Sequence, residues 1–280
     1  MKKIILLLGL LIVGTSIAFG AECKYTCVEP YNMNNKVSSF FSSLTGLNFT
    51  RSKISEAVIE KSINKSVKGG KMNVTLDSYS AKDLANGIFK SIKISGKDVS
   101  IDGIYLSSLE LESLCEFNYV EYDKKGNLAF KEDFPMSFKI QMSNDDVNNT
   151  MQSERYKKVI NDLNKLGVGG IKISSTKASI RGNKFYYSFM FSVPFMKERK
   201  VELTADLNVK NGKIDFQNTR LVSNSFKLDL KKLDSLLDYL NPLDFSVNIF
   251  DNKDAKVYIK NIAIKNNIIH ADGIIIIPKD

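Results

Sequence analysis

The side chains able to carry out chemistry are few in this sequence. The 280-residue chain contains one His, three Cys and no Trp. His270 therefore has no second imidazole with which to share a metal ion or to divide acid and base roles. It lies between Ile269 and Ala271 with no constellation of an acid and a nucleophile around it, which favours a structural or surface position. We predict no catalytic residue, metal site or cofactor; enzyme is the least favoured class and would depend on His270 or Cys115.

Other reactive-looking clusters have simpler interpretations. Glu110, Glu112 and Glu116 share one parity of an alternating segment, which is typical of a solvated strand face. The glycine-rich stretch 167–170 lacks the lysine of a phosphate-binding loop. Residues 144–146 fall short of a calcium loop and suit the start of a helix.

The positive charge does not indicate nucleic-acid binding. The chain has 40 Lys and Arg against 31 Asp and Glu, a net charge of +9, but only five of the 40 are Arg. Arg is the side chain that forks onto phosphates and reads bases. Dispersed Lys residues are typical of a solvated surface, so we predict no nucleic-acid partner.

The N-terminus has the pattern of a secretory signal peptide. A positive start at residues 1–3 precedes an apolar run at 4–13 and small residues at 18 and 20. An uncleaved anchor is the alternative. Removal of residues 1–20 takes away two Lys and no acid, which leaves 38 basic against 31 acidic residues, a net charge of +7. We therefore expect an exported protein.

Export exposes the cysteines to an oxidising compartment. Cys23 and Cys27 are close in sequence, and we predict a short structural disulfide between them. Cys115 is left over in this scheme, and we expect it to be buried.

Periodicity predicts a strand-rich single domain. Residues 21–50 have no sustained period and are interpreted as a loose extension before one domain over 51–280. Apolar residues at helical spacing predict helices at 52–67, 81–89, 144–166 and 230–240. Gly69-Gly70 is interpreted as the stop of the first of these helices. Alternation predicts strands at 72–76, 107–121, 136–142, 171–180, 185–193, 201–210, 213–223, 245–250, 255–264 and 268–277. Turns are expected at 181–184, 211–212 and 266–267.

The segment 107–121 suggests the shape of the sheet. Alternation over fifteen residues predicts a strand of about 50 Å at ~3.3 Å per residue. The expected fold class is therefore α+β, a long, strongly curved antiparallel β-sheet wrapped around one or two helices.

One predicted strand is unusually aromatic. Phe185, Tyr187, Phe189, Phe191 and Val193 share one face of the segment 185–193. This face is either ordinary protein core or the lining of a pocket for an apolar ligand, and the sequence alone leaves both open.

Four segments together resemble a known family. They are a short helix and glycine leading into a strand at 85–94 (A-N-G-I-F-K-S-I-K-I), a strand pair at 101–104 and 109–111, a proline-led strand at 135–140 before a helix, and L-N-P-L at 240–243 before paired strands that end at Asp272-Gly273. In this order the chain resembles the LmeA-like phospholipid-binding family of bacterial envelope proteins, which is related to the tubular lipid-binding (TULIP) folds. The resemblance covers about residues 52–278. It implies a TULIP-like sheet curled around a long helix, a lipid cavity between them, and a periplasmic or cell-surface location. The Lys- and Asn-rich surface and the extension 21–50 depart from the family and leave the head-group preference open.

The leading hypothesis is an exported phospholipid-binding or phospholipid-shuttling protein with peripheral membrane contact. Acyl chains would lie between the apolar sheet face and the enclosing helices. The predicted lipid-binding residues are Ile54, Val58, Ile88, Phe89, Phe138, Val147, Met151, Leu163, Phe185, Tyr187, Phe189 and Phe191. The alternative is a non-lipid envelope scaffold or adhesin-like β-rich interaction protein whose apolar face is only core.

Overall fold

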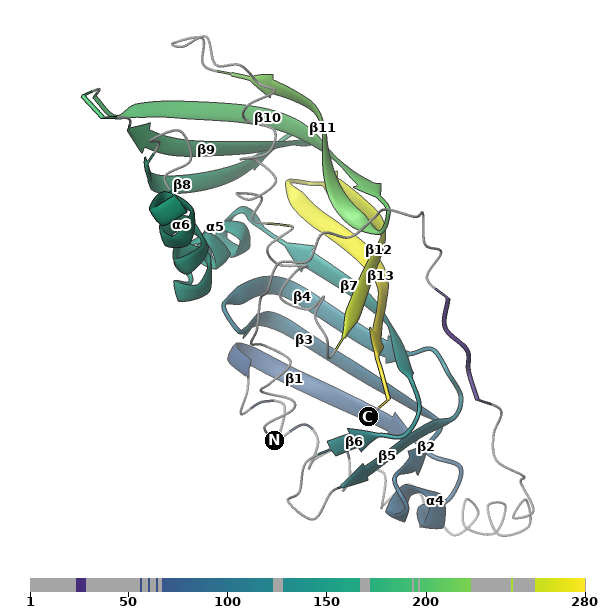
Figure 1. The fold of residues 1–280 in the computed structure, drawn as a ribbon. Helices are drawn as coiled ribbons and strands as arrows, with labels where there is room; N and C mark the ends of the chain where they lie inside the picture. The colour runs from purple at the N-terminus through teal and green to yellow at the C-terminus, as the bar shows by residue number, and fades with distance from the viewer. Residues whose placement is uncertain are drawn as a thin grey trace.

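The computed structural model shows a strand-rich α+β fold (Figure 1). It describes residues 24–28, 67–122, 128–166, 172–192, 194–195, 197–222 and 255–279, together with Glu56, Glu60, Asn64 and Leu243. The predicted signal peptide, the helix at 230–240 and the strand at 245–250 lie outside these residues, as does most of the extension 21–50. The described strands pair antiparallel throughout, so the predicted α+β, sheet-rich class is confirmed.

The larger sheet has six strands. Their order is β1 (Val67–Asp77), β3 (Ser91–Ile101), β4 (Ile104–Ser113), β7 (Phe134–Met142), β13 (Ile268–Ile277) and β12 (Lys256–Lys265). The β12–β13 hairpin turns at Asn266 and Asn267, whose φ angles of 52° and 59° are left-handed, as Asn tolerates better than most residues. This hairpin confirms the predicted turn at 266–267.

The second sheet is a four-stranded meander. Its order is β11 (Lys213–Leu221), β10 (Arg199–Lys210), β9 (Lys184–Ser192) and β8 (Lys172–Arg181). Burial alternates residue by residue along β9, because a strand with one apolar face packs that face inward. The predicted meander and its two turns are confirmed. A third, small sheet contains β2 (Ile88–Phe89), β5 (Asn118–Tyr122) and β6 (Leu128–Phe130).

The single strand predicted over 107–121 is wrong. β4 ends at Ser113, and the chain resumes as β5 in a different sheet at Asn118. The Asn118 side-chain amide donates to the carbonyl oxygens of Lys90 and Cys115, both at 2.9 Å, and fixes this break. The strong curvature expected from a 50 Å strand is therefore also wrong: the sheets are made of shorter strands and are neither strongly curled nor closed.

The helix predicted over 144–166 is divided in two. α5 (Asn144–Gln152) begins at Ser143, whose side chain forms a reciprocal capping box with Asp146. At Ser153 the backbone is extended, with ψ at 151°, and α6 (Glu154–Leu166) follows in a new direction. Tyr156 N–H donates to the Ser153 hydroxyl at 3.3 Å, so the interruption caps the second helix.

Helix α5 joins the two large sheets. The backbone N–H of Tyr105 in β4 donates to the Thr150 hydroxyl at 3.0 Å, and the Ser107 hydroxyl donates to the Asp146 carboxylate. On its other side the helix binds β8 through Asn side chains. α5 therefore fixes the separation between the sheets (Figure 1).

Amide side chains cover two sheet edges. Asn148 donates to the Ala178 carbonyl at 2.9 Å and accepts from its N–H at 3.0 Å, which replaces a neighbouring strand. The edge of β1 is treated in the same way by Asn64, which pairs with Met72 at 3.0 and 2.7 Å. Two further pairs extend the cover on β8: Asn144 with Ile180 and Asn164 with Ile173. Unsatisfied edge groups invite strand addition by other chains, so this cover protects the monomer.

The start of β1 differs from the prediction. Glu56, Glu60 and Asn64 are helical, but Val67 already belongs to β1, so the helix predicted over 52–67 extends too far. The pair Gly69-Gly70, interpreted as a helix stop, lies inside the strand, and a Cβ on Gly70 would lie 1.9 Å from the Lys97 carbonyl oxygen. The close approach of β3 explains the glycine there.

The helix predicted over 81–89 is also shorter than expected. α4 (Ala81–Ala85) ends before Gly87, which has a φ of 78°, and residues 88–89 then form β2.

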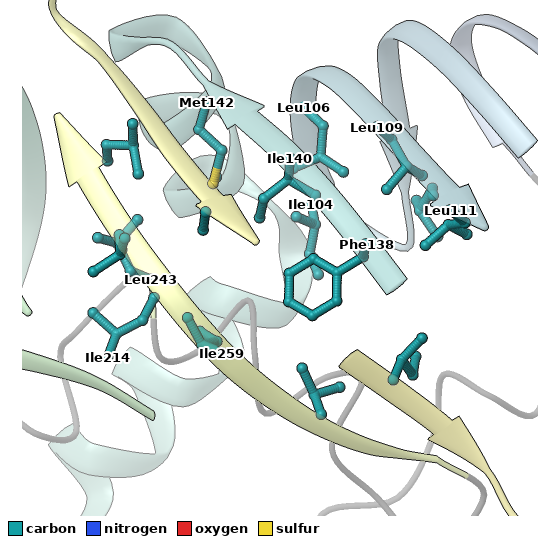
Figure 2. Close-up of a pocket in the computed structure, with 16 residues that line it drawn as sticks. Ile104, Leu106, Leu109, Leu111, Phe138, Ile140, Met142, Ile214, Leu243 and Ile259 are labelled. Carbon is teal, nitrogen blue, oxygen red and sulfur yellow. The ribbon is translucent and has the colours of Figure 1, made fainter. Parts of the chain in front are cut away.

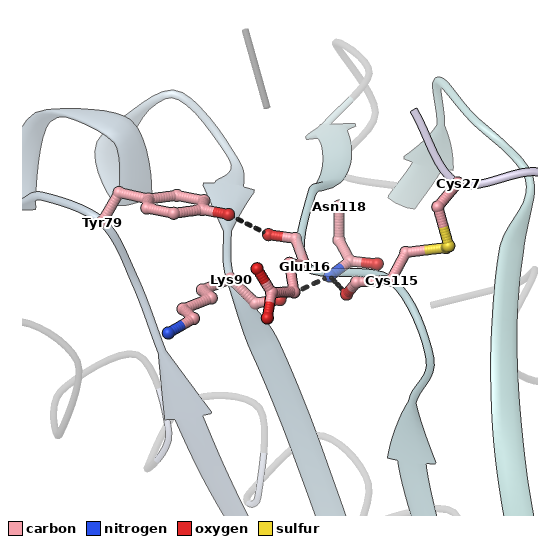
Figure 3. Close-up of a disulfide and its surroundings, with 6 residues drawn as sticks. All are labelled: Cys27, Tyr79, Lys90, Cys115, Glu116 and Asn118. Atoms are coloured by element: carbon pink, nitrogen blue, oxygen red, sulfur yellow. Dashed lines mark hydrogen bonds between the residues drawn. A yellow bond between two sulfur atoms is a disulfide. The ribbon is translucent and has the colours of Figure 1, made fainter. Parts of the chain in front are cut away.

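The disulfide joins Cys27 to Cys115 across 88 residues of sequence (Figure 3). The predicted Cys23–Cys27 pairing is therefore wrong, although Cys115 is buried as expected. Residues 24–28 have no helical or strand structure, and they reach the break between β4 and β5, where Cys115 lies beside the Asn118 hydrogen bonds. Proximity in the fold, rather than in the sequence, determines the partner.

Candidate functional site

An apolar cavity of about 120 Å³ lies on one face of the six-stranded sheet (Figure 2). Its floor comes from β3, β4, β7, β13 and β12, and Ile214 of β11 and Leu243 complete the lining. No lining side chain carries a polar group. The lining residues are Ile101, Ile104, Leu106, Leu109, Leu111, Phe138, Ile140, Met142, Ile214, Leu243, Val257, Ile259, Ile262, Ile269, Ala271 and Ile275.

The strand register explains why these residues lie together. Leu109 of β4 is opposite Ile140 of β7, and Ile140 is opposite Ala271 of β13. Ala271 is in turn opposite Ile262 of β12, which completes a row across four strands. A second row passes from Leu111 through Phe138 and Gly273 to Ile259. Directly opposed residues project from the same face, so the two rows form one continuous apolar floor.

Small residues in β13 leave the space open. Ala271 projects only a methyl group, and Gly273 projects nothing. A Cβ on Gly273 would lie 2.8 Å from the Phe138 ring and 2.0 Å from the Tyr258 carbonyl oxygen. The ring therefore lies over Gly273, and a larger residue there would push it away. The cavity is the volume that longer side chains in the middle of these rows would occupy.

Strand β4 contributes to the lining through a change of parity. Ile104 and Leu106 are buried at even positions, whereas Leu109 and Leu111 turn inward at odd positions. The change falls at Ser107-Ser108, where α5 is attached through Asp146. The alternation predicted over 107–121 places Leu109 and Leu111 on the apolar face, as observed. It does not extend to Ile104 and Leu106, which the prediction therefore missed.

Only one predicted lipid-binding residue, Phe138, lines the cavity. The helix positions Val147, Met151 and Leu163 and the aromatic stripe of β9 lie instead in the central hydrophobic core between α5, α6 and the sheets. Phe89 belongs to a separate cluster near the small sheet, where its ring is 6.0 Å from that of Phe134. Ile88 is half-buried in β2, and Ile54 and Val58 lie outside the described residues.

The aromatic stripe of Phe185, Tyr187, Phe189 and Phe191 is packed core. Neighbouring rings of the stripe lie 6.0 and 6.2 Å apart, and Phe185 stacks on Phe216 at 5.5 Å. Of the two interpretations left open by the sequence, the structure supports core for this face.

The polar pair inside the core is not arranged for chemistry. The hydroxyls of Tyr156 and Tyr187 are 3.1 Å apart, and both side chains are buried. Burial raises the pKa of Tyr156 to about 12 and raises that of Tyr187 well above its usual value, because phenolate loses its hydration there. Both groups therefore stay neutral and hydrogen-bonded at physiological pH.

The lining residues that the prediction missed come mainly from β4, β12 and β13. Part of their signal is visible in the sequence: 268–277 has Ile269, Ala271 and Ile275 on one parity, whereas in 255–264 the aliphatic residues change parity between Ile259 and Ile262. The prediction gives greater weight to aromatic residues, which in the structure fill space rather than leave it.

Two other kinds of feature are absent from the described part of the chain. Among these residues, no group of three or more His, Cys, Asp or Glu side chains is placed to hold a metal ion. No helix within the described ranges has both the length and the apolar character needed to cross a bilayer.

Comparison with known proteins returned no matching family model, no matching curated protein and no matching solved structure.

Proposed function

We propose that this chain is an exported lipid-binding protein that holds part of a phospholipid acyl chain in the apolar cavity. The observation that carries the proposal is a lining made wholly of aliphatic side chains and one phenylalanine ring. Each methylene moved from water into such a site contributes about 0.8 kcal/mol, so an acyl chain needs no polar partner there.

The cavity size limits what it accommodates. At about 120 Å³ it is close to the ~150 Å³ apolar cavities that stay dry and take up benzene. It therefore accepts a short stretch of hydrocarbon, and the remainder of a long chain with its head group would extend beyond it. An empty apolar cavity also costs stability, which a ligand restores.

Two further features support this proposal. The Cys27–Cys115 disulfide is of a kind that persists in oxidising compartments, which agrees with export to the periplasm or cell surface. Helix α5 lies between two antiparallel sheets, an arrangement compatible with relation to the LmeA-like family and the tubular lipid-binding folds. Relation to that family is part of the proposal.

Lipid extraction tests the proposal. The protein is purified from an exporting host, extracted with organic solvent and analysed by mass spectrometry, then offered a panel of phospholipids. We expect acyl lipid to copurify or to bind. We expect Ala271→Leu, which fills the cavity, to abolish binding. The matched variant Ala263→Leu lies on the opposite face of the same strand pair and should retain it.

Absence of lipid both after purification and after the panel would refute the proposal. It would favour the alternative of a non-lipid envelope scaffold or adhesin-like interaction protein. Equal lipid binding by Ala271→Leu and the unsubstituted protein would show that the ligand binds elsewhere.

A further inference from the structure

The β9–β10 hairpin ends in an apolar tip that projects from the four-stranded sheet at the upper left of Figure 1. Phe195 is fully exposed there, at 109% of its reference area, whereas the other large apolar side chains found exposed in the described ranges reach at most 49%. It follows Pro194, which is exposed as well. A ring so completely in water has a hydrophobic cost that folding does not relieve.

The turn holds Phe195 in an unusual backbone conformation. Its φ is 66°, in the left-handed region that bulky L-residues rarely adopt. The preceding Pro194 has its own φ fixed by its ring. The fold therefore keeps a large apolar residue at a turn position that Gly or Asn would occupy with less strain.

Basic residues lie directly behind the apolar tip. Lys197, Arg199 and Lys200 follow Phe195 within five positions, and Lys172 at the start of β8 is opposite Ser192. Lys197 and Lys172 are exposed. Two acids lie among them: Glu198 accepts a hydrogen bond from the Ser174 hydroxyl, and Glu202 accepts one from the Lys200 ammonium at 2.9 Å. The four basic residues outnumber these two acids, so the hairpin end has a net positive charge behind the apolar point.

We propose that this tip, residues 194–195 and 197–200, is a docking site for an anionic phospholipid bilayer. Phe195 inserts at the level of the head groups, where aromatic side chains are favoured, and the cations contact lipid phosphates. A single ring with a few cations is far smaller than the ~800 Å² per partner of a stable protein interface. A bilayer accepts such a small apolar anchor combined with charge. This docking goes beyond the proposed function, because it requires no ligand in the cavity.

A tryptophan probe tests insertion directly. The chain has no Trp, so Phe195→Trp places the only one at the tip. On vesicles of phosphatidylcholine with phosphatidylglycerol we expect its emission to shift to the blue and its quenching by iodide to fall. Tyr105→Trp, an exposed position on β4, is the matched probe and should not respond. An unchanged Phe195→Trp spectrum on these vesicles would overturn the proposal.

Vesicle sedimentation tests separately how much the Phe195 ring and the basic residues contribute to bilayer binding. Phe195→Asn keeps a residue that tolerates the left-handed turn, and we expect it to weaken binding about tenfold or more. Lys197→Gln should weaken binding about fivefold and reduce its salt dependence, whereas Lys213→Gln at the β10–β11 turn should not. Unaltered binding by Phe195→Asn, or equal binding to pure phosphatidylcholine, would contradict docking to anionic lipid. Ala271→Leu should still dock, so failure of the cavity proposal and failure of this one are distinguishable.

Discussion

Filling the cavity should make the lipid-free protein more stable. Ala271 projects into the cavity from the middle of the row Leu109, Ile140, Ala271 and Ile262. At ~24 cal/mol per Å³, a void of about 120 Å³ costs about 3 kcal/mol, which is the upper limit of what filling it returns. Ala271→Leu adds three carbons, about 2.4 kcal/mol at ~0.8 kcal/mol each, from which imperfect fit subtracts about 1 kcal/mol. We expect a gain of about 1–2 kcal/mol in the free energy of unfolding.

Urea unfolding of the delipidated protein measures this gain in stability. Ala→Leu substitutions at two other positions serve as controls. Ala178 is buried in the core of β8 and does not line the cavity, so Ala178→Leu should lose about 1–3 kcal/mol by overpacking. Ala263→Leu, on the opposite sheet face, should change stability by less than about 0.5 kcal/mol. If Ala271→Leu destabilised the protein as much as Ala178→Leu, the space beside Ala271 would not be free, and the reasoning from the cavity would fail.

Three further predictions concern what holds the fold together. Cys115→Ser removes a cross-link between residues 88 apart and should lower the free energy of unfolding by up to about 4–5 kcal/mol; equal urea midpoints for the variant and the oxidised protein would contradict this. Asn148→Ala removes both hydrogen bonds to the β8 edge and should cost about 1–3 kcal/mol, with faster amide exchange along β8; unchanged exchange would show that the edge is held in another way. The raised pKa of Tyr156, about 12, means that its contribution is complete below pH 10 and is lost as the pH rises towards 12. Tyr156 should therefore lower the free energy of unfolding by roughly 2–3 kcal/mol over that interval, and the raised pKa of the neighbouring Tyr187 adds a further fall. Tyr156→Phe should show only the smaller fall that Tyr187 causes, and a fall equal to that of the unsubstituted protein would refute this origin.

Local patterns predicted the strands whose partners are close in sequence. The strands of the β8–β11 meander and of the β12–β13 hairpin alternate over most of their length, and the turns at 182–183, 211–212 and 266–267 consist of Gly and Asn residues. Periodicity and turn chemistry therefore agree there. The failures occur where a distant contact overrides a local pattern. Alternation continues through Cys115, but the chain leaves the sheet there because Cys27 and the Asn118 amide hold it in another place. Gly70 resembled a helix stop and serves instead as a close contact with Lys97.

The candidate site was harder to predict because a cavity is defined by what is missing. Phe138 was predicted correctly because it lies in a clearly alternating strand. Its position over Gly273, however, depends on the pairing of β7 with β13, and these two residues are 135 positions apart in the sequence. No periodicity within either strand shows that pairing. The size of the cavity depends on Ala271 and Gly273 lying side by side with larger residues, which is also a matter of register.

The aromatic face of β9 is tightly packed, whereas the aliphatic face of the six-stranded sheet leaves a cavity. Along β9 the rings contact one another and are covered by α5 and α6, and Tyr156 closes the layer by its hydroxyl contact with Tyr187 at 3.1 Å. Of the sixteen cavity residues, fourteen of which belong to the six-stranded sheet, eight are Ile and only one is aromatic. A β-branched side chain has few rotamers and cannot extend to fill a gap beside Ala271 or Gly273. A flexible acyl chain can follow such a rigid aliphatic surface, because it gains contact at every methylene and needs no fixed polar partner. For this reason, we assign ligand binding to the isoleucine-rich sheet face rather than to the aromatic one.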